Sequence, residues 1–210
     1  MCSSPLIAML CIPLLALSYT LAPHAGVLRG VGSSASPAVA CAMLVQVEQE
    51  PLVESTCGFD FVPLRTALQA GDFLEADQLT RDGLIKLAGE SAVKRGYVYF
   101  AEIPRLPEAD LASIERLWRA YSKDKFGYSV QSKIFNSKKV NCKFEDFFDR
   151  IGWTNDQGKL LRWLPDKGNE FIYDLDKAPD GHLPLTSALR GTQLLEGLLA
   201  HPAMQREEFD

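Results

Sequence analysis

Histidine and cysteine are scarce in this chain, and their scarcity removes whole classes of function. Histidine occurs three times in 210 residues, at His24, His182 and His201, and of the five cysteines only Cys57 and Cys142 lie beyond residue 47. Two distant thiols make a poor disulfide framework, and no spacing of Cys and His indicates a metal site. Nucleophile elbow, phosphate-binding loop and HExxH patterns are missing as well. The sequence therefore favours a protein without a catalytic centre.

Acidic residues are absent from the first 47 positions, and all 27 Asp and Glu follow from Glu48 onward. Removing Arg29, the one basic residue of that stretch, leaves 21 Lys and Arg against 27 acidic residues, a formal charge of −6. A mildly acidic body argues against a nucleic-acid partner, because such binding relies on Lys and Arg that neutralise phosphates. Its length suits one domain with a single hydrophobic core.

The acid-free stretch predicts a targeting leader in two parts. Residues 5–18 form an uncharged apolar run of the length of a signal-peptide core, shorter than the roughly 20 residues that span a bilayer. Residues 19–47 contain many Ser, Ala and Gly and resemble a transit peptide. We therefore predict a signal-peptide-like segment at 1–18 and a transit-peptide-like segment at 19–47, the bipartite leader of an alga with a complex plastid. An ordinary secreted protein is the alternative.

Apolar residues recur at helical spacing in the first half of the body. After a linker at 48–58, residues 61–71 and 72–89 predict two antiparallel helices that meet at a tight turn, with Asp72 capping the second helix. A third helix is predicted from Pro107, a residue favoured in first turns. Its predicted core stripe consists of Leu111, Ile114, Leu117, Trp118 and Tyr121.

Shorter elements are predicted around this third helix. Residues 96–103 are predicted to be extended, ending before Pro104. Ser129 is placed to cap a helix that runs to Phe135, and residues 144–151 again show helical spacing. From Trp153, turn signals predict a loop-rich segment up to a last helix near Ser187. We therefore predict an all-α domain over residues 59–201, followed by a C-terminal tail at 202–210.

Four strings in the body resemble one known family. They are LWRAYS (117–122), KFGYSVQSKIF (125–135), FFDRIGW (147–153) and APDGHLP (178–184). In this order and spacing they resemble the porphyrin-binding family named "genomes uncoupled four", and the hairpin at 61–89 resembles its first helices. The chain departs from the family pattern at Phe135, where a Trp is usual, and we expect it to lack the extra N-terminal helical bundle of cyanobacterial members.

The resemblance implies a helical domain shaped like a cupped hand that binds protoporphyrin IX and magnesium protoporphyrin IX. It implies a regulator of chlorophyll synthesis in the plastid, not an enzyme, whose partner is the large, porphyrin-binding subunit of magnesium chelatase. Peripheral association with plastid membranes is a further expectation, and no protein-bound metal is expected. The alternative is a helical interaction or plastid-signalling module without an obligatory pigment, because an aromatic loop also binds protein helices.

Candidate porphyrin-binding residues combine apolar side chains with nearby cations. A porphyrin is a flat apolar disc with two propionates at one edge, so its host needs an apolar face and cationic groups at the rim. Residues 123–143 carry six Lys and one Asp among several aromatic residues. The predicted site consists of Phe126, Tyr128, Val130, Ile134, Phe135, Lys138, Arg162, Trp163, Phe171, Tyr173, His182 and Leu183. The alternative for each is an aromatic core residue or a solvated lysine.

His182 is the predicted site residue with the most varied chemistry. An imidazole can ligate the metal of a porphyrin. Here the Asp180-Gly181 turn signal and the prolines at 179 and 184 surround it. We therefore expect His182 to hydrogen-bond within a rigid loop beside the pocket.

Overall fold

Residues 61–89 form the helical hairpin that their spacing predicts. In the computed structural model, which describes residues 50–162, 170–186 and 192–209, the hairpin consists of α1 (Val62–Gln69) and α2 (Phe73–Leu87). Asp72 caps α2 as predicted, because its side chain accepts a hydrogen bond from the Glu75 backbone N–H. Gly71 between the helices has a φ of 71°, a left-handed conformation that glycine adopts without strain.

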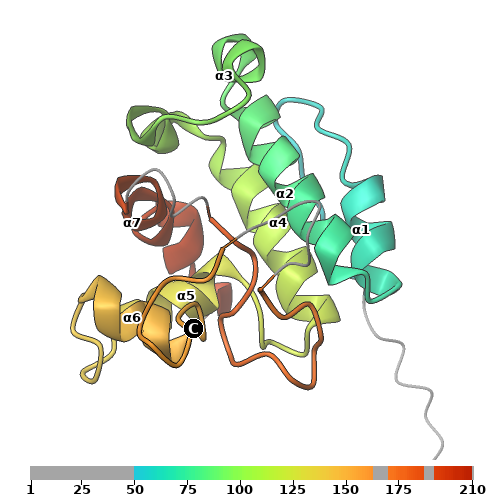
Figure 1. The fold of residues 1–210 in the computed structure, drawn as a ribbon. Helices are drawn as coiled ribbons and strands as arrows, with labels where there is room; N and C mark the ends of the chain where they lie inside the picture. The colour runs from blue at the N-terminus through green and yellow to red at the C-terminus, as the bar shows by residue number, and fades with distance from the viewer. Residues whose placement is uncertain (1–49, 163–169, 187–191, 210) are drawn as a thin grey trace, which may run out of the picture. The chain divides into compact units, whose positions relative to one another are not determined.

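The third helix, α4 (Glu108–Tyr121), lies between this hairpin and the C-terminal elements. Figure 1 shows α1, α2 and α4 side by side. The Trp118 indole N–H donates to the Thr80 hydroxyl at 2.9 Å and so joins α4 to α2. The predicted core stripe is confirmed, since four of its five residues are fully buried: Leu111, Ile114, Leu117 and Trp118.

Short helices complete the described part of the chain. They are α3 (Glu90–Arg95), η1 (Phe100–Arg105), α5 (Tyr128–Phe135), α6 (Phe144–Arg150), α7 (Gln193–Leu199), η3 (Pro202–Gln205) and η4 (Glu207–Phe209). α5 contacts both α6 and α7, and α7 (dark red in Figure 1) also contacts η1. Within the described ranges no β-strand occurs, only an isolated bridge between Thr154 and Leu160. The prediction of an all-α fold is confirmed.

Two segments differ from their predicted local structure. Within the segment at 96–103, Gly96 is the left-handed C-cap of α3 and Tyr99 is extended. Phe100–Arg105 then forms η1, because the Glu102 carboxylate accepts the Tyr99 backbone N–H at 2.9 Å. Ser129 does not cap α5, which begins one residue earlier, at Tyr128. Its hydroxyl donates instead to a carboxylate oxygen of Glu115. In both places a carboxylate that accepts backbone N–H groups decides where the helix begins.

Glu115 of α4 caps α5 from a neighbouring helix. Its fully buried carboxylate accepts the backbone N–H groups of Tyr128 at 2.7 Å and Ser129 at 3.0 Å. These are two of the amide groups that a helix leaves without a partner at its N-terminus. Gly127 has a φ of 140°, and a Cβ there would lie 2.3 Å from Glu115 Oε1. The glycine of the KFGYSVQ string is therefore required by this close approach.

The predicted linker and C-terminal tail both pack against α4. Asp110 is buried and accepts hydrogen bonds from the Ser55 hydroxyl at 2.6 Å and the Thr56 N–H at 3.0 Å. At the other end Glu208 pairs with Arg116 at 2.9 Å, and Phe209 is buried. A buried carboxylate needs such donors, but partners more than 50 residues away leave no local signal. Residues on both sides of the predicted domain, 59–201, therefore contact α4.

Several predictions fall on residues that the structure does not describe. They are the leader segments 1–18 and 19–47, the start of the last helix near Ser187, and Trp163 of the predicted site. Among the helices that are described, none is both long enough and apolar enough to cross a bilayer.

Candidate functional site

A cavity of about 710 Å³ opens between α2, the segment before η1, the loop after α6 and the start of α7. Its volume falls in the range of about 300–1,000 Å³ that is usual for small-molecule sites. The charged side chains on its described wall are Arg81 and Asp82 of α2. Five aromatic side chains line it: Tyr97, Tyr99, Phe100, Trp153 and Phe171. We call it the aromatic cavity.

The first wall of the aromatic cavity is the segment that leads into η1. Tyr99 and Phe100 leave 48% and 54% of their surface exposed, unusually much for aromatic residues. Arg95 holds this wall in place, because its guanidinium pairs with Glu102 at 2.6 Å and lies 4.4 Å from the Tyr99 ring centroid. The Tyr99 N–H and Arg95 together lower the pKa of Glu102. The Tyr99 and Phe100 rings are thus exposed on a segment that Arg95 and Glu102 hold in place.

Trp153 and Phe171 form a second aromatic part of the lining, and His182 supports them. The Trp153 indole N–H donates to the His182 carbonyl at 2.8 Å, and the Phe171 ring lies edge-on to Trp153 at 6.1 Å between centroids. The His182 ring is fully buried: Nδ1 donates to the Ile151 carbonyl at 2.7 Å, and Nε2 accepts the Ile172 N–H at 3.0 Å. Burial lowers the pKa of His182. Its neutral ring therefore has no nitrogen left for a metal.

Three of the segments that carry the family resemblance are joined by hydrogen bonds. Gln131 of KFGYSVQSKIF donates to the carbonyls of Gly181 and Pro184 in APDGHLP, both at 2.9 Å. The bond from Trp153 to His182 joins FFDRIGW to the same loop. Leu185, directly after this loop, lines the aromatic cavity. These strings therefore form the frame that positions the cavity wall, while most of the wall comes from other segments.

Most residues of the predicted site line neither this cavity nor the one described next. Phe126, Tyr128, Phe135 and Leu183 are buried in the core, Val130 and Ile134 are half-buried, and Lys138 is exposed after α5. Phe171 lines the aromatic cavity. Arg162 is exposed next to Leu161, a lining residue, and pairs with Glu170 at 3.3 Å. The structure thus places Phe171 in the lining of this cavity, His182 behind Trp153 and Phe171, and Arg162 next to the lining residue Leu161 in the chain.

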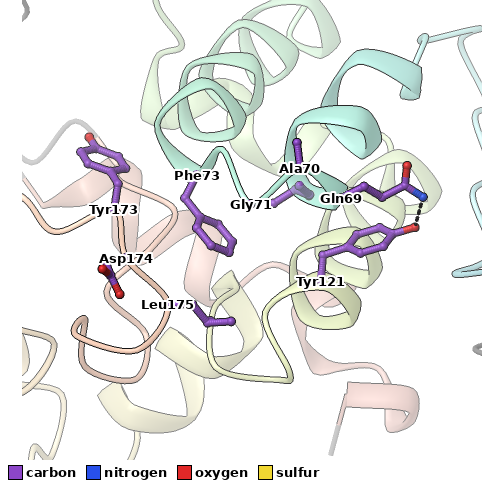
Figure 2. A pocket seen from close by; sticks show the side chains of 9 residues that line it. Gln69, Ala70, Gly71, Phe73, Tyr121, Tyr173, Asp174 and Leu175 are labelled. Atoms are coloured by element: carbon purple, nitrogen blue, oxygen red, sulfur yellow. Dashed lines mark hydrogen bonds between the residues drawn. The ribbon is translucent and has the colours of Figure 1, made fainter.

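Tyr173 lines a second, smaller cavity of about 480 Å³ at the hairpin turn, which we call the hairpin cavity. Figure 2 shows it between the α1–α2 turn, the end of α4 and the loop at 173–175. Tyr121 closes one side, where its hydroxyl accepts a hydrogen bond from the Gln69 side chain at 2.9 Å. Its lining mixes polar and apolar residues and contains three aromatic side chains, Phe73, Tyr121 and Tyr173. The hairpin cavity is therefore the poorer match for a flat apolar ligand.

Sequence reasoning missed the first wall and the cation beside it. The string YVYF at 97–100 has three aromatic residues in four positions, and this density was a usable signal. Its β-like composition points instead to a buried strand. Arg81 gives no signal of its own, because one basic residue on a helix is ordinary. In the described ranges no cluster of His, Cys, Asp and Glu could hold a metal ion.

Comparisons with known proteins give the same relatives by sequence and by structure. The Arabidopsis thaliana protein named "Tetrapyrrole-binding protein, chloroplastic" is 46% identical over 153 residues, covering 68% of this chain and 54% of that protein. The Ycf53-like protein of Synechocystis is 40% identical over 150 residues, covering 71% and 61%. The match thus spans little more than half the length of these curated relatives.

Solved structures of two relatives superpose on the chain. GUN4 from Chlamydomonas reinhardtii gives a TM-score of 0.67 at 44% identity, covering 75% of this chain and 97% of that one. The ligand-free structure of Arabidopsis thaliana GUN4 gives 0.62 at 45% identity, covering 70% and 98%. A family model described as GUN4-like matches residues 54–202, more than half of the sequence. The chain belongs to the GUN4-like family.

Proposed function

We propose that this chain is a non-catalytic tetrapyrrole-binding protein that holds protoporphyrin IX or magnesium protoporphyrin IX in the aromatic cavity. The observation that carries the proposal is a cavity of about 710 Å³ lined by five aromatic side chains. It lies within the residues that match the GUN4-like family. A relative with 46% identity is named a tetrapyrrole-binding protein.

The two aromatic walls suit the two faces of a macrocycle. Tyr99 and Phe100 offer exposed rings, and the half-buried Phe171, which packs on the buried Trp153, offers a further ring. Offset stacking and edge-on contacts between such rings and a π-system are favourable. Covering one large apolar side chain contributes about 1–3 kcal/mol. The affinity would therefore come mainly from apolar contact.

The propionates require cations at the edge of the cavity. Arg81 lines the cavity from α2, and Arg162 lies beside the lining residue Leu161. A guanidinium matches a carboxylate with two parallel hydrogen bonds. Lys138 follows α5, and neither it nor its chain neighbours line the aromatic cavity, so it does not contribute in this arrangement. We therefore assign the propionates to Arg81 and Arg162.

His182 takes part as a support and not as a ligand of magnesium. Both of its ring nitrogens are hydrogen-bonded to the backbone of neighbouring segments. Retention of the pigment then rests on ring contact and carboxylate recognition, which metal-free and magnesium porphyrin share. The protein's role is to bind and present the pigment without chemistry of its own.

The finer assignments of partner and location belong to the same proposal. The chain would present its pigment to the large subunit of magnesium chelatase in the plastid, stimulate magnesium insertion in chlorophyll synthesis, and associate peripherally with plastid membranes. The family resemblance supports the partner, and the word "chloroplastic" in the name of the Arabidopsis relative supports the location. The acid-free leader at 1–47 supports import through a bipartite signal.

One observation favours a second candidate function. Tyr99, Phe100 and Leu160 are all large apolar residues with more than 40% of their surface exposed, and all line the same cavity. A protein helix can place its apolar side chains in such a groove. In that case the chain would be an interaction or signalling module without an obligatory pigment.

Titration with protoporphyrin IX, followed by absorbance and fluorescence quenching, separates the two candidates. Wild-type protein should bind, and Phe100→Ala and Phe171→Ala should each weaken binding by about 1–3 kcal/mol. Tyr121→Ala is the matched control, because it removes an aromatic ring from the hairpin cavity instead. Wild-type protein that fails to bind, or three variants with equal losses, would contradict the proposal.

A further inference from the structure

A buried carboxylate lies directly behind the wall of the aromatic cavity. Asp77 of α2 has no exposed surface. Its Oδ1 accepts the Leu185 backbone N–H at 2.6 Å, and its Oδ2 accepts from Arg81 Nη2 at 2.8 Å. Arg81 and Leu185 both line the cavity. Asp77 is therefore hydrogen-bonded to two residues that a ligand in the cavity would contact.

Asp77 depends strongly on Arg81 for its charge. Burial raises its pKa to about 6, even though Arg81 and the Leu185 N–H act to lower it. The Arg81 side chain is mostly covered, but 22% of its surface is exposed and it lines the cavity, so it can also reach a ligand. An uncompensated charge in a buried place is costly, and such a group takes up a proton instead.

The other titratable neighbours do not replace Arg81. Tyr128 of α5 is neutral, and the charges of Asp77 and of Glu115 on α4 both contribute to raising its pKa, after burial. Glu115 is occupied in capping α5. Thr186 lines the cavity beside Leu185. The Thr186 hydroxyl lies close enough to Tyr128 to act against the rise of its pKa. In the described structure neither of these two hydroxyls makes a hydrogen bond of normal geometry. Arg81 is thus the one cation that acts on Asp77 among the described residues.

We infer that an anionic ligand in the aromatic cavity competes with Asp77 for Arg81, so that binding the ligand is accompanied by uptake of a proton at Asp77. This inference rests on the proposed function, since it takes the ligand to be a tetrapyrrole with carboxylate side chains. Two effects act in the same direction. The ligand carboxylate draws hydrogen bonds from the guanidinium, and its own negative charge lies near Asp77. Both favour the protonated acid.

Linkage gives the direction of the pH dependence. If the complex holds a proton that free protein lacks, then the affinity rises as the pH falls. The window opens at about pH 6, where free Asp77 titrates, and extends upward to the pKa that Asp77 has in the complex. Across it, Kd should change by up to about tenfold for each pKa unit by which the ligand shifts Asp77. The propionates remain ionised in this range.

Isothermal titration calorimetry of the full-length chain with deuteroporphyrin IX, a more soluble dicarboxylate porphyrin, measures this uptake. Titrations at pH 7 in two buffers with different ionisation enthalpies give the number of protons taken up. Wild-type protein should take up a substantial fraction of one proton and bind more tightly at pH 6.5 than at pH 8.5. Asp77→Asn keeps an oxygen acceptor for the Leu185 N–H. This variant should bind the porphyrin without proton uptake, and its Kd should vary less with pH.

Glu75→Gln is the matched control, since it neutralises an exposed carboxylate on the same helix away from the cavity. It should keep the wild-type uptake, and any proton exchange by the ligand itself is common to all variants. Binding by wild-type protein without proton uptake, at a pH-independent Kd, would overturn the inference and leave the proposed function intact. No binding at any pH would instead overturn the proposed function. The wild-type result decides even if Asp77→Asn fails to fold.

Discussion

The molecule contains two groups of aromatic residues that look alike in the sequence and differ in exposure. Phe73, Trp118 and Phe126 pack on one another with centroids 5.4–6.4 Å apart and have at most 4% of their surface exposed. Tyr99 and Phe100 are about half exposed at the aromatic cavity. The first group builds the core, and the second remains available to a ligand.

The neighbours of each group explain the difference. Helices α2 and α4 meet over the core group, where Trp118 is tied to Thr80 across the interface. No described helix covers Tyr99 and Phe100 in the same way, because Arg95 and Glu102 brace their segment at the surface. An aromatic ring that charged side chains keep exposed at the surface is available to bind a ligand, whereas a ring packed between helices stabilises the fold.

The largest expected effect is on the core group. Phe126→Ala should lower the free energy of unfolding by about 3–5 kcal/mol, because it leaves a cavity among fully buried rings. Urea denaturation followed by circular dichroism measures this loss. Molecules that remain folded should bind porphyrin with unchanged affinity. A stable variant that has lost binding would place Phe126 in the site and break the comparison.

His182 supports the Trp153 and Phe171 part of the aromatic cavity, and its removal should cost less. His182→Gln should lower the free energy of unfolding by about 1–3 kcal/mol, because one or both buried hydrogen bonds are lost. Its main effect on porphyrin should come from a looser Trp153 and Phe171 wall. Thermal melts beside binding titrations separate these two effects.

The pH dependence of stability sharpens the prediction for His182. Its pKa is lowered in the folded state, so below about pH 6.5 the unfolded chain binds a proton that the folded chain does not. Stability should therefore fall as the pH drops from 7.5 to 5.5. His182→Gln should flatten part of this slope. His201, whose pKa is also lowered, retains its share, and Asp77 acts with the opposite sign. An unchanged slope would mean that His182 is not held neutral.

The cavity group should show the reverse of the core group. Phe100→Ala should weaken porphyrin binding by about 1–3 kcal/mol. It should change the free energy of unfolding by no more than about 0.5 kcal/mol, since the ring is more than half exposed. Paired titrations and denaturation curves test both numbers. Equal losses of stability for Phe100→Ala and Phe126→Ala would remove the distinction between the groups.

The smallest expected effect is at the rim. Arg162 is exposed and already pairs with Glu170. Arg162→Ala should weaken porphyrin binding by about 0–1 kcal/mol at low salt and by less at high salt, because exposed ion pairs are weak and screened. Arg81→Gln, at a partly covered position, should cost more and depend less on salt. Titrations of both variants at two ionic strengths check this order.

The helices were largely predictable from the sequence, because they follow from local spacing. The stripe on α4 and the cap at Asp72 are visible within a few residues of sequence. Other contacts are not local: Glu115 caps α5 from 13 residues away, and Asp110 binds Thr56 of the predicted linker from 54 residues away. Such partners cannot be read from spacing alone.

The candidate site was harder to predict than the fold. Aromatic side chains beside lysines suggested residues 126–138, but burial depends on which helices meet over a ring, and the sequence does not state this. The resemblance identified the family correctly through strings such as KFGYSVQSKIF, which the structure shows to be a frame. Phe171 was found because it lies in a loop without helical periodicity. Tyr99 and Phe100 were missed because their spacing is strand-like.

A crystal structure of the protein with protoporphyrin IX bound tests the central claim most directly. The account predicts that the macrocycle lies in the aromatic cavity between Phe100 and Phe171, with a propionate within hydrogen-bonding distance of Arg81 and with His182 still bound to the Ile151 carbonyl. A macrocycle in the hairpin cavity, on the surface of α5 near Lys138, or ligated by His182 would contradict it.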